Sequence, residues 1–155
     1  KFVSDVWMRQ HGFLQSDWEL GTMGDLLRTL GPRPLLTVEV DALMTPELQR
    51  RIFECHPELA FWVMNTQTAL TEPKKMKSRP YVPGLELRRR LLVEQGFDLE
   101  FVHSQPFRTS EAGADDFLDA CACCWTAARV LGGRAQCFPE TPDLDPKGLR
   151  QEIRA

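Results

Sequence analysis

The sequence predicts one α/β domain in which helices alternate with short strands. The chain of 155 residues is 43% hydrophobic and 26% charged, which is the composition of a globular domain with a single core. Three β-prone runs alternate with stretches that carry helical spacing and helix-end signals. We expect a core over residues 35–138, a peripheral tail over residues 139–155, and an N-terminal segment over residues 1–34 to which we assign no function.

The first half of this core combines short elements of both kinds. Residues 35–43 form an apolar run that fits either a strand or a helix. A Thr-Pro pair then predicts a short helix over residues 48–50. Residues 51–55 are β-prone and predict a strand. A Pro-Glu pair fits the first turn of the next helix, residues 57–64, because proline lacks the amide that this turn leaves unbonded.

The middle of the chain predicts two loops that enclose a helix and a strand. Residues 66–83 contain three prolines and a run of cations, which is typical of a loop. Residues 84–95 have the spacing of an amphipathic helix, with Gly96 at the position of a C-terminal cap. Residues 97–102 alternate as a strand does, and residues 104–113 are polar and loop-like.

A long helix is predicted over residues 113–131. It carries no charge from Ala120 to Ala128, so we expect protein to surround it on most sides. Its three aspartates are crowded into the first turns, and a Gly-Gly pair ends it. Residues 135–138 then predict a short edge strand.

The cysteines and the hydropathy pattern indicate a protein of the cytosol. Five cysteines are present, and three of them fall within four positions of the long helix, where neighbours do not easily pair. Reduced, buried cysteines are therefore expected, as in a cytosolic protein. No apolar run is long enough to cross a bilayer or to serve as a signal peptide, so no membrane partner is expected. The glycine-rich and Gly-x-Ser-x-Gly motifs of several large enzyme classes do not occur.

The aspartates of the long helix are the first candidate for chemistry. Asp115 and Asp119 are four residues apart, and Asp116 and Asp119 are three apart, so each pair shares a helical face. Such a pair can bind a divalent cation between its carboxylates. The alternative is that the acids only complement the positive end of the helix dipole.

A glutamate at the end of the first predicted strand is the second candidate. Ligands of open α/β sheets bind where strand ends meet helix N-termini, and Glu54 falls at such a position. An ordinary solvated glutamate is the alternative. His56 and Glu58 could support the site, or could be a structural histidine and a helix-capping acid.

A basic strip is the third candidate. Residues 74–90 carry seven cations and one anion, although the net charge of the chain is −3. The strip could hold a phosphate backbone through electrostatics that do not depend on base sequence, or it could be a solvated surface. No aromatic platform for stacking bases accompanies it. The candidate nucleic-acid ligands are Lys74, Lys75, Lys77, Arg79, Arg88 and Arg89.

Several segments occur together in a recognisable order. They are Val38-Glu-Val-Asp-Ala-Leu-Met, Ile52-Phe-Glu-Cys-His-Pro-Glu-Leu-Ala-Phe, Lys74-Lys75 followed by Arg88 to Leu92, Asp115-Asp-Phe-Leu-Asp-Ala, and Lys147-Gly-Leu with Glu152-Ile. In order and spacing they resemble the family of predicted RNase H-like nucleases catalogued as domain of unknown function 429. The resemblance extends over residues 38–155.

This resemblance implies both a fold and a reaction. The fold is a mixed sheet flanked by helices, and the reaction is metal-dependent hydrolysis of nucleic-acid phosphodiester bonds. The resemblance implies that Glu54, Asp116 and Asp119 are catalytic metal ligands, with Asp115 as a substitute ligand. Chemistry of this kind uses two Mg²⁺ or Mn²⁺ ions to activate water and to stabilise the leaving oxygen.

The start of the chain departs from the family pattern. The family's Gly-x-Asp-Gly strand and Asp-Ile-Pro segment do not occur, Asp5 is a poor substitute, and Thr37 stands where a lysine is expected. We therefore expect an RNase H-like fold that is incomplete at its N-terminus, either as a fragment, as a chain that has lost segments, or as a diverged and inactive member. The rival hypothesis is a non-catalytic RNase H-like module that binds nucleic acid or a protein. An enzyme acting on small phosphate substrates is a third possibility.

Overall fold

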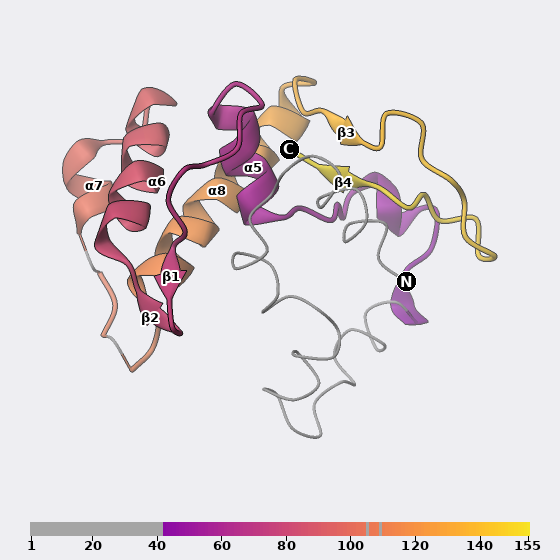
Figure 1. Ribbon diagram of the computed structural model, residues 1–155. Helices are drawn as coiled ribbons and strands as arrows, with labels where there is room; N and C mark the ends of the chain where they lie inside the picture. Colours follow the sequence, from indigo (N-terminus) through magenta and orange to yellow (C-terminus); the bar gives the residue numbers. More distant parts are fainter. Residues whose placement is uncertain (1–41, 105, 109) are drawn as a thin grey trace. The chain divides into compact units, whose positions relative to one another are not determined.

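The computed structural model describes residues 42–104, 106–108 and 110–155 (Figure 1). The predictions for residues 1–34, Thr37 and the start of the 35–43 run fall outside these ranges. The described residues contain four α-helices and two small antiparallel sheets, which confirms the predicted α/β class. No helix within them is long and apolar enough to cross a membrane.

The chain divides into two compact units. Among the described residues, the first unit comprises residues 42–54 and 137–153, and the second comprises residues 55–136 with 154–155. All four α-helices and the hydrophobic core lie in the second unit. The candidate residues other than Glu54 therefore belong to one compact body.

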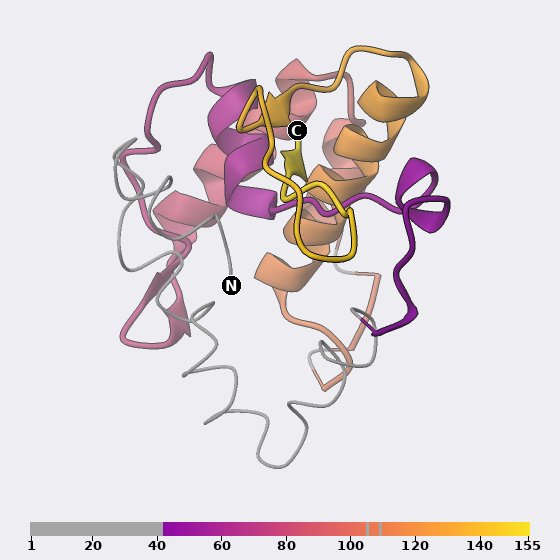
Figure 2. The same ribbon diagram turned by 90° about the vertical axis from the view of Figure 1, so that its right-hand side faces the viewer.

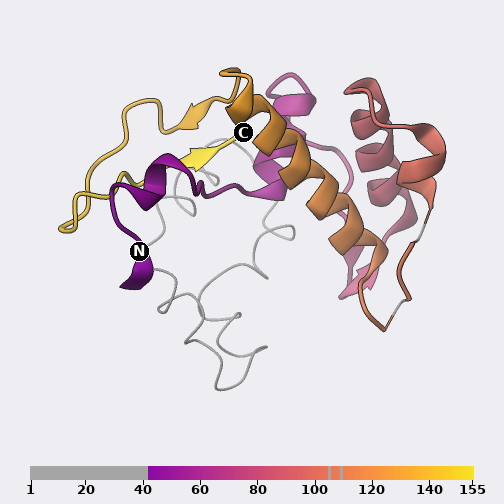
Figure 3. The ribbon, with the colours of Figure 1, turned by 180° about the vertical axis from the view of Figure 1, so that it is seen from behind.

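The second unit is built around its last helix. Its helices are α5 (Pro57–Met64), α6 (Val82–Glu94), α7 (Leu99–His103) and α8 (Ala114–Leu131). Figure 3 shows α8 running diagonally in front of α5, and α8 packs against both α5 and α6. The side chains that fill this interface are almost completely buried and include Phe61, Leu85, Leu91, Leu92, Val102 and Leu118.

Local signals account for α5, α6 and α8, which confirms those predictions. Pro57 occupies the first turn of α5, and Glu58 places a carboxylate at the positive end of the helix dipole. Helix α6 begins two residues before its predicted start and gives way to Gly96, whose φ of +95° is easily adopted only by glycine. Helix α8 was expected to be surrounded on most sides, which is wrong, because Ala120 and Cys124 are exposed.

Two predicted strands are not strands. Residues 51–55 form no strand in the described part of the chain, and Cys55 contributes an isolated parallel bridge to Arg154. In the second predicted strand, residues 97–102, residues 99–102 instead lie within α7, whose N-cap is Asp98. The Asp98 carboxylate accepts a hydrogen bond from the Phe101 amide at 2.8 Å, which stabilises the first turn of a helix rather than an extended backbone.

Among the described residues of the first unit, the helical and strand elements are short. A 3-10 helix, η2 (Leu48–Arg50), forms where the sequence predicts a short helix, and the Leu48 amide donates to the Thr45 hydroxyl oxygen at 3.2 Å. Strand β3 (Cys137–Phe138) confirms the predicted edge strand and pairs with β4 (Ile153–Arg154). The end of the chain was expected to be peripheral, yet Leu149 and Ile153 are buried.

The five cysteines all lie in described positions and are thiols, as expected. Only Cys121 is fully buried, whereas Cys124 is exposed, so the expectation that all of them are buried is wrong.

Candidate functional site: an acid–lysine cluster on α8

Carboxylates and lysines meet between α5, α8 and a small hairpin. The hairpin consists of β1 (Lys75–Met76) and β2 (Arg79–Pro80), and Figures 1 and 2 show it at the N-terminal end of α6. All of these elements lie in the second unit. We call the group the acid–lysine cluster, and it comprises Glu58, Lys74, Lys75, Asp115 and Asp119.

Lys74 is the central cation of the cluster. Its Nζ lies 2.6 Å from Asp119 Oδ2 and 3.7 Å from Glu58 Oε1, so one lysine connects helix α8 to helix α5. Only 14% of its side chain is exposed. Burial by itself lowers the pKa of this lysine, but Asp119 and Glu58 outweigh it and raise the pKa above its ordinary value. Lys74 is therefore held in its charged form.

Lys75 forms the second pair of the cluster. Its Nζ lies 2.6 Å from Asp115 Oδ2, and the Asp115 side chain is 5% exposed. Asp115 and Asp119 are one helical turn apart, so their carboxylates follow one another along the same face of α8. Two neighbouring lysines therefore pair with two aspartates that lie one turn apart on that face.

A tight turn positions the two lysines. Lys77 and Ser78 both have positive φ, at 48° and 62°, which gives the hairpin a two-residue turn of the type that matches the twist of paired strands. In the register that results, Lys75 lies opposite Pro80 and Met76 opposite Arg79. The prolines and the run of cations predict a loop over residues 66–83, so this hairpin was not expected. Its turn lacks the glycine or asparagine that usually marks such a hairpin.

The base of the hairpin is held against α6 by a close backbone contact. A Cβ placed on Gly84 would overlap with the carbonyl oxygen of Pro73, the residue before Lys74. Only glycine permits this approach between the first turn of α6 and the segment that carries the lysines.

Arg88 connects the same parts from inside the core. Its side chain is completely buried, and its guanidinium binds both carboxylate oxygens of Glu58, at 3.1 and 2.5 Å. Nη1 also donates to the carbonyl oxygens of Glu72 and Gly84, at 3.0 and 2.9 Å. Arg88 thus fixes α5, α6 and the start of the hairpin segment to one another, and it has no surface with which to bind a phosphate.

The remaining cations of the basic strip differ in their surroundings. Arg89 donates to Glu86 and to the carbonyl oxygen of Val102. Lys77 and Arg79 are exposed on the hairpin, and none of the described residues gives either of them an acidic partner. Both side chains are therefore available to an anion in solution.

Asp116 is not part of the cluster. It is exposed, and its Oδ2 accepts a hydrogen bond from the Gly113 amide at 2.9 Å, so it caps the start of α8. The resemblance named Asp116 and Asp119 as ligands and Asp115 as a substitute. The structure instead brings Asp115 together with Asp119.

Glu54 and His56 are the remaining candidates from the sequence. Glu54 is exposed and belongs to the first unit, so its predicted convergence with the aspartates stays a prediction. His56 is half-buried at the N-cap position of α5, where its side chain forms no capping hydrogen bond.

Asp119 is the most perturbed carboxyl of the cluster. Burial raises its pKa from an ordinary 3.8 to about 6, with smaller upward contributions from Glu58 and Asp115, while Lys74 opposes the rise. One oxygen, Oδ2, binds Lys74, but Oδ1 is buried without a hydrogen-bond partner in the described part of the chain. A buried oxygen of this kind retains an unused capacity to accept a hydrogen bond, to bind a cation or to hold a proton.

This pKa predicts a pH dependence of stability. Between about pH 4 and pH 6 the folded protein retains a proton on Asp119 that the unfolded chain releases, so this carboxyl makes stability fall as the pH rises through that window. Urea unfolding at several pH values gives the free energy of unfolding of the native protein and of Asp119→Asn. The difference between these two free energies should vary between about pH 4 and pH 6 and should be constant above pH 6. Parallel pH profiles would contradict the raised pKa.

The cluster contains few side chains that could ligate a metal. Within the described ranges, no group of three or more His, Cys, Asp or Glu side chains is placed to hold a metal ion. Both oxygens of Glu58 accept hydrogen bonds from Arg88, so Asp115 and Asp119 are the carboxylates of the cluster that could ligate a cation. The described residues alone therefore do not supply a two-ion site.

Comparison with known proteins identifies the family. Residues 30–144 match the family model described as Protein of unknown function (DUF429), which is more than half of the chain. The chain belongs to this family. The matched residues of the DUF429 domain include the whole acid–lysine cluster and Arg88. No curated protein and no solved structure matches the chain. The family description assigns no activity, so the nuclease expectation stays a prediction.

Proposed function

We propose that this protein is a metal-dependent nuclease that hydrolyses nucleic-acid phosphodiester bonds at the acid–lysine cluster. The observation that carries the proposal is the pairing of Asp115 and Asp119 with two consecutive lysines, beside a buried Asp119 oxygen that lacks a partner. Perturbed carboxyls next to fixed cations are typical of catalytic sites. The RNase H-like fold and a cytosolic location, both implied earlier by the sequence, belong to the same proposal.

The two aspartates suit a hard divalent cation. Mg²⁺ keeps several water ligands and is commonly held by one or two carboxylates together with substrate phosphates. Asp115 and Asp119 offer two carboxylates, and Asp119 Oδ1 is an oxygen that could ligate a metal and that no other group binds in the described part of the chain. A bound Mg²⁺ or Mn²⁺ would activate water and stabilise the leaving oxygen.

Lys74 and Lys75 would bind the phosphate groups of the substrate. Lys74 and Lys75 each carry a charge that is balanced by an aspartate. When a phosphate binds these lysines, the carboxylates lose their compensating charge and become stronger cation ligands. Binding of the nucleic-acid backbone and binding of the metal should therefore favour each other, and such coupling is reciprocal.

The test of this proposal is metal-dependent thermal stability. Saturating Mn²⁺ should raise the melting temperature of the native protein by about 5 °C or more, because a ligand at 100 times its Kd stabilises a fold by about 2.7 kcal/mol. Asp119→Asn should lose this shift. Asp116→Asn is the matched control, since Asp116 caps the same helix outside the cluster, and it should keep the shift.

Equal shifts in the native protein and in Asp119→Asn would remove the metal role from the cluster. Cleavage of a labelled oligonucleotide in Mn²⁺ should follow the same pattern across the three proteins.

One observation favours a second candidate, a non-catalytic module that binds nucleic acid or a protein. Each carboxylate of the cluster already has a cationic partner, as in a structural network of ion pairs. The exposed Lys77 and Arg79 would then supply the contact with phosphates. This candidate predicts oligonucleotide binding without cleavage and without a Mn²⁺ shift, in the same set of measurements.

A further inference from the structure

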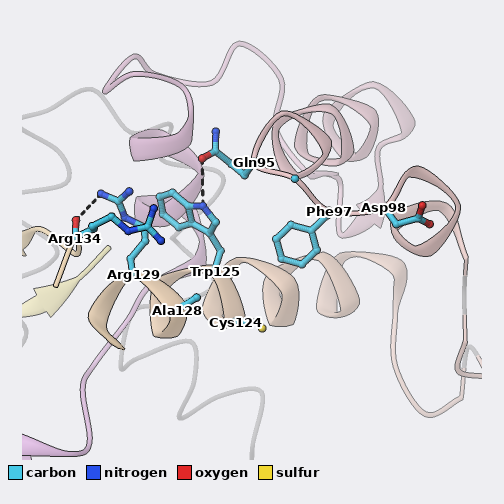
Figure 4. A pocket seen from close by; sticks show the side chains of 9 residues that line it. Gln95, Phe97, Asp98, Cys124, Trp125, Ala128, Arg129 and Arg134 are labelled. Atoms are coloured by element: carbon cyan, nitrogen blue, oxygen red, sulfur yellow. Dashed lines mark hydrogen bonds between the residues drawn. The ribbon is translucent and has the colours of Figure 1, made fainter. Parts of the chain in front are cut away.

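A surface depression lies at the other end of α8 from the aspartates. It has a volume of about 490 Å³, within the range of small-molecule sites, and is open to solvent (Figure 4). One wall comes from the turn between α6 and α7, and the other comes from the second half of α8 and the residues that follow it. The residues that carry its chemistry are Gln95, Phe97, Trp125, Ala128, Arg129 and Arg134.

Trp125 organises one end of this depression. Its indole Nε1 donates to Gln95 Oε1 at 3.2 Å, and the guanidinium carbon of Arg129 lies 4.5 Å from its ring centre. Arg129 Nη2 also donates to the carbonyl oxygen of Arg134 at 2.7 Å. Figure 4 shows these contacts side by side. The tryptophan and the loop after α8 therefore hold Arg129 in one orientation.

The two arginines have no acidic partner in the part of the chain that the structure describes. None of the described residues forms an ion pair with Arg129 or Arg134, and Arg129 Nε is buried without a hydrogen-bond partner. Burial and the neighbouring charge of Arg134 lower the pKa of Arg129. The one acid of the lining, Asp98, is drawn well away from Arg129 and already caps α7. The negative end of the α8 dipole would account for one arginine at this position. It does not account for both Arg129 and Arg134, or for the buried Arg129 Nε that lacks an acceptor among the described residues.

The rest of the lining is apolar. Phe97 is half-buried against the core and Ala128 is exposed, and both line the depression with carbon atoms that a ligand can contact. A flat ring can pack against such a surface while a charged group on the same ligand reaches the guanidinium groups.

We propose that this depression binds a nucleoside monophosphate, with the phosphate held by Arg129 and Arg134 and the base packed against the wall formed by Phe97 and Ala128. Guanidinium groups match phosphate oxygens through paired, charge-assisted hydrogen bonds. The site is separate from the acid–lysine cluster, because Arg129 follows Asp119 by ten residues of α8, or about 15 Å along the helix axis. The inference does not depend on the proposed function.

Calorimetric titration of the full chain with adenosine 5′-monophosphate tests this assignment. Adenosine and inorganic phosphate should each bind at least about tenfold more weakly, since each lacks one half of the ligand. Arg134→Gln should weaken binding of the nucleotide about tenfold to a hundredfold. This variant should fold normally, because Arg134 is exposed and its carbonyl oxygen, which holds Arg129, is retained.

Arg108→Gln is the matched control, because it removes the same charge from an exposed arginine outside the lining, and it should bind the nucleotide as the native protein does. Asp119→Asn should also retain binding, which separates this test from that of the nuclease. The assignment is overturned if the nucleotide does not bind, or if Arg134→Gln binds it unchanged. Equal binding of inorganic phosphate and nucleotide would overturn the role of the apolar wall.

Discussion

Replacing Arg88 by leucine is expected to lower the free energy of unfolding by about 3–5 kcal/mol. The guanidinium is completely buried and satisfies both oxygens of Glu58, which is itself 3% exposed. Leucine would fill part of the space but would leave the Glu58 charge buried, with Lys74 at 3.7 Å as its remaining cationic contact among the described residues. It would also remove the side-chain hydrogen bonds to the carbonyl oxygens of Glu72 and Gly84.

Arg90→Leu is the matched control for this prediction. Arg90 lies on the same helix, its side chain is 66% exposed, and its contact with Glu94 is 3.7 Å long, so its loss should cost less than about 1 kcal/mol. Urea unfolding of both variants gives the comparison. Adding Glu58→Leu to Arg88→Leu should recover much of the loss, because the isolated buried charge is then removed. Equal stability of Arg88→Leu and Arg90→Leu would show that Arg88 does not hold the core together.

Substituting Gly84 by alanine is expected to destabilise the protein by several kcal/mol, although helix propensity alone predicts a gain of about 1 kcal/mol. The new Cβ would overlap with the backbone carbonyl of Pro73, and backbone atoms cannot move aside as a flexible side chain can. Either α6 or the segment that carries Lys74 and Lys75 must shift. The sign of the change therefore distinguishes the close contact from simple propensity.

Gly96→Ala provides the comparison for Gly84→Ala. Gly96 has a φ of +95° and no atom close to the position of a new Cβ, so its substitution should cost only about 1–2 kcal/mol of backbone strain. Thermal unfolding of the two variants should place Gly84→Ala well below Gly96→Ala. A Gly84→Ala variant as stable as the native protein would mean that the hairpin is not packed against α6 as described.

The helices could be predicted because their signals are local. The Pro-Glu start of α5, the glycine after α6 and the acidic first turn of α8 are each legible within a few residues. The two predicted strands failed because a strand requires a partner, which a short β-prone run does not reveal. At residues 97–102 the capping signal of Asp98 was present in the sequence and outweighed the apparent alternation.

The candidate site could be predicted only in part. The spacing of Asp115 and Asp119 places them on one face of a helix from sequence alone. Their lysine partners depend on a turn at Lys77 and Ser78 that carries no usual turn residue. Arg88 was assigned to phosphate binding as part of the basic strip, but it is buried against Glu58. Glu58 lies 30 residues earlier in the chain, so local sequence patterns do not reveal this contact.

A crystal structure of the protein soaked in Mn²⁺ is the most direct test of the proposed catalytic centre. We expect an anomalous peak bound by Asp115 and Asp119, with Lys74 Nζ moved away from the Asp119 oxygen that it now contacts at 2.6 Å. A structure in which both lysines keep their aspartates and no Mn²⁺ lies beside α8 would contradict a metal-dependent reaction at this cluster.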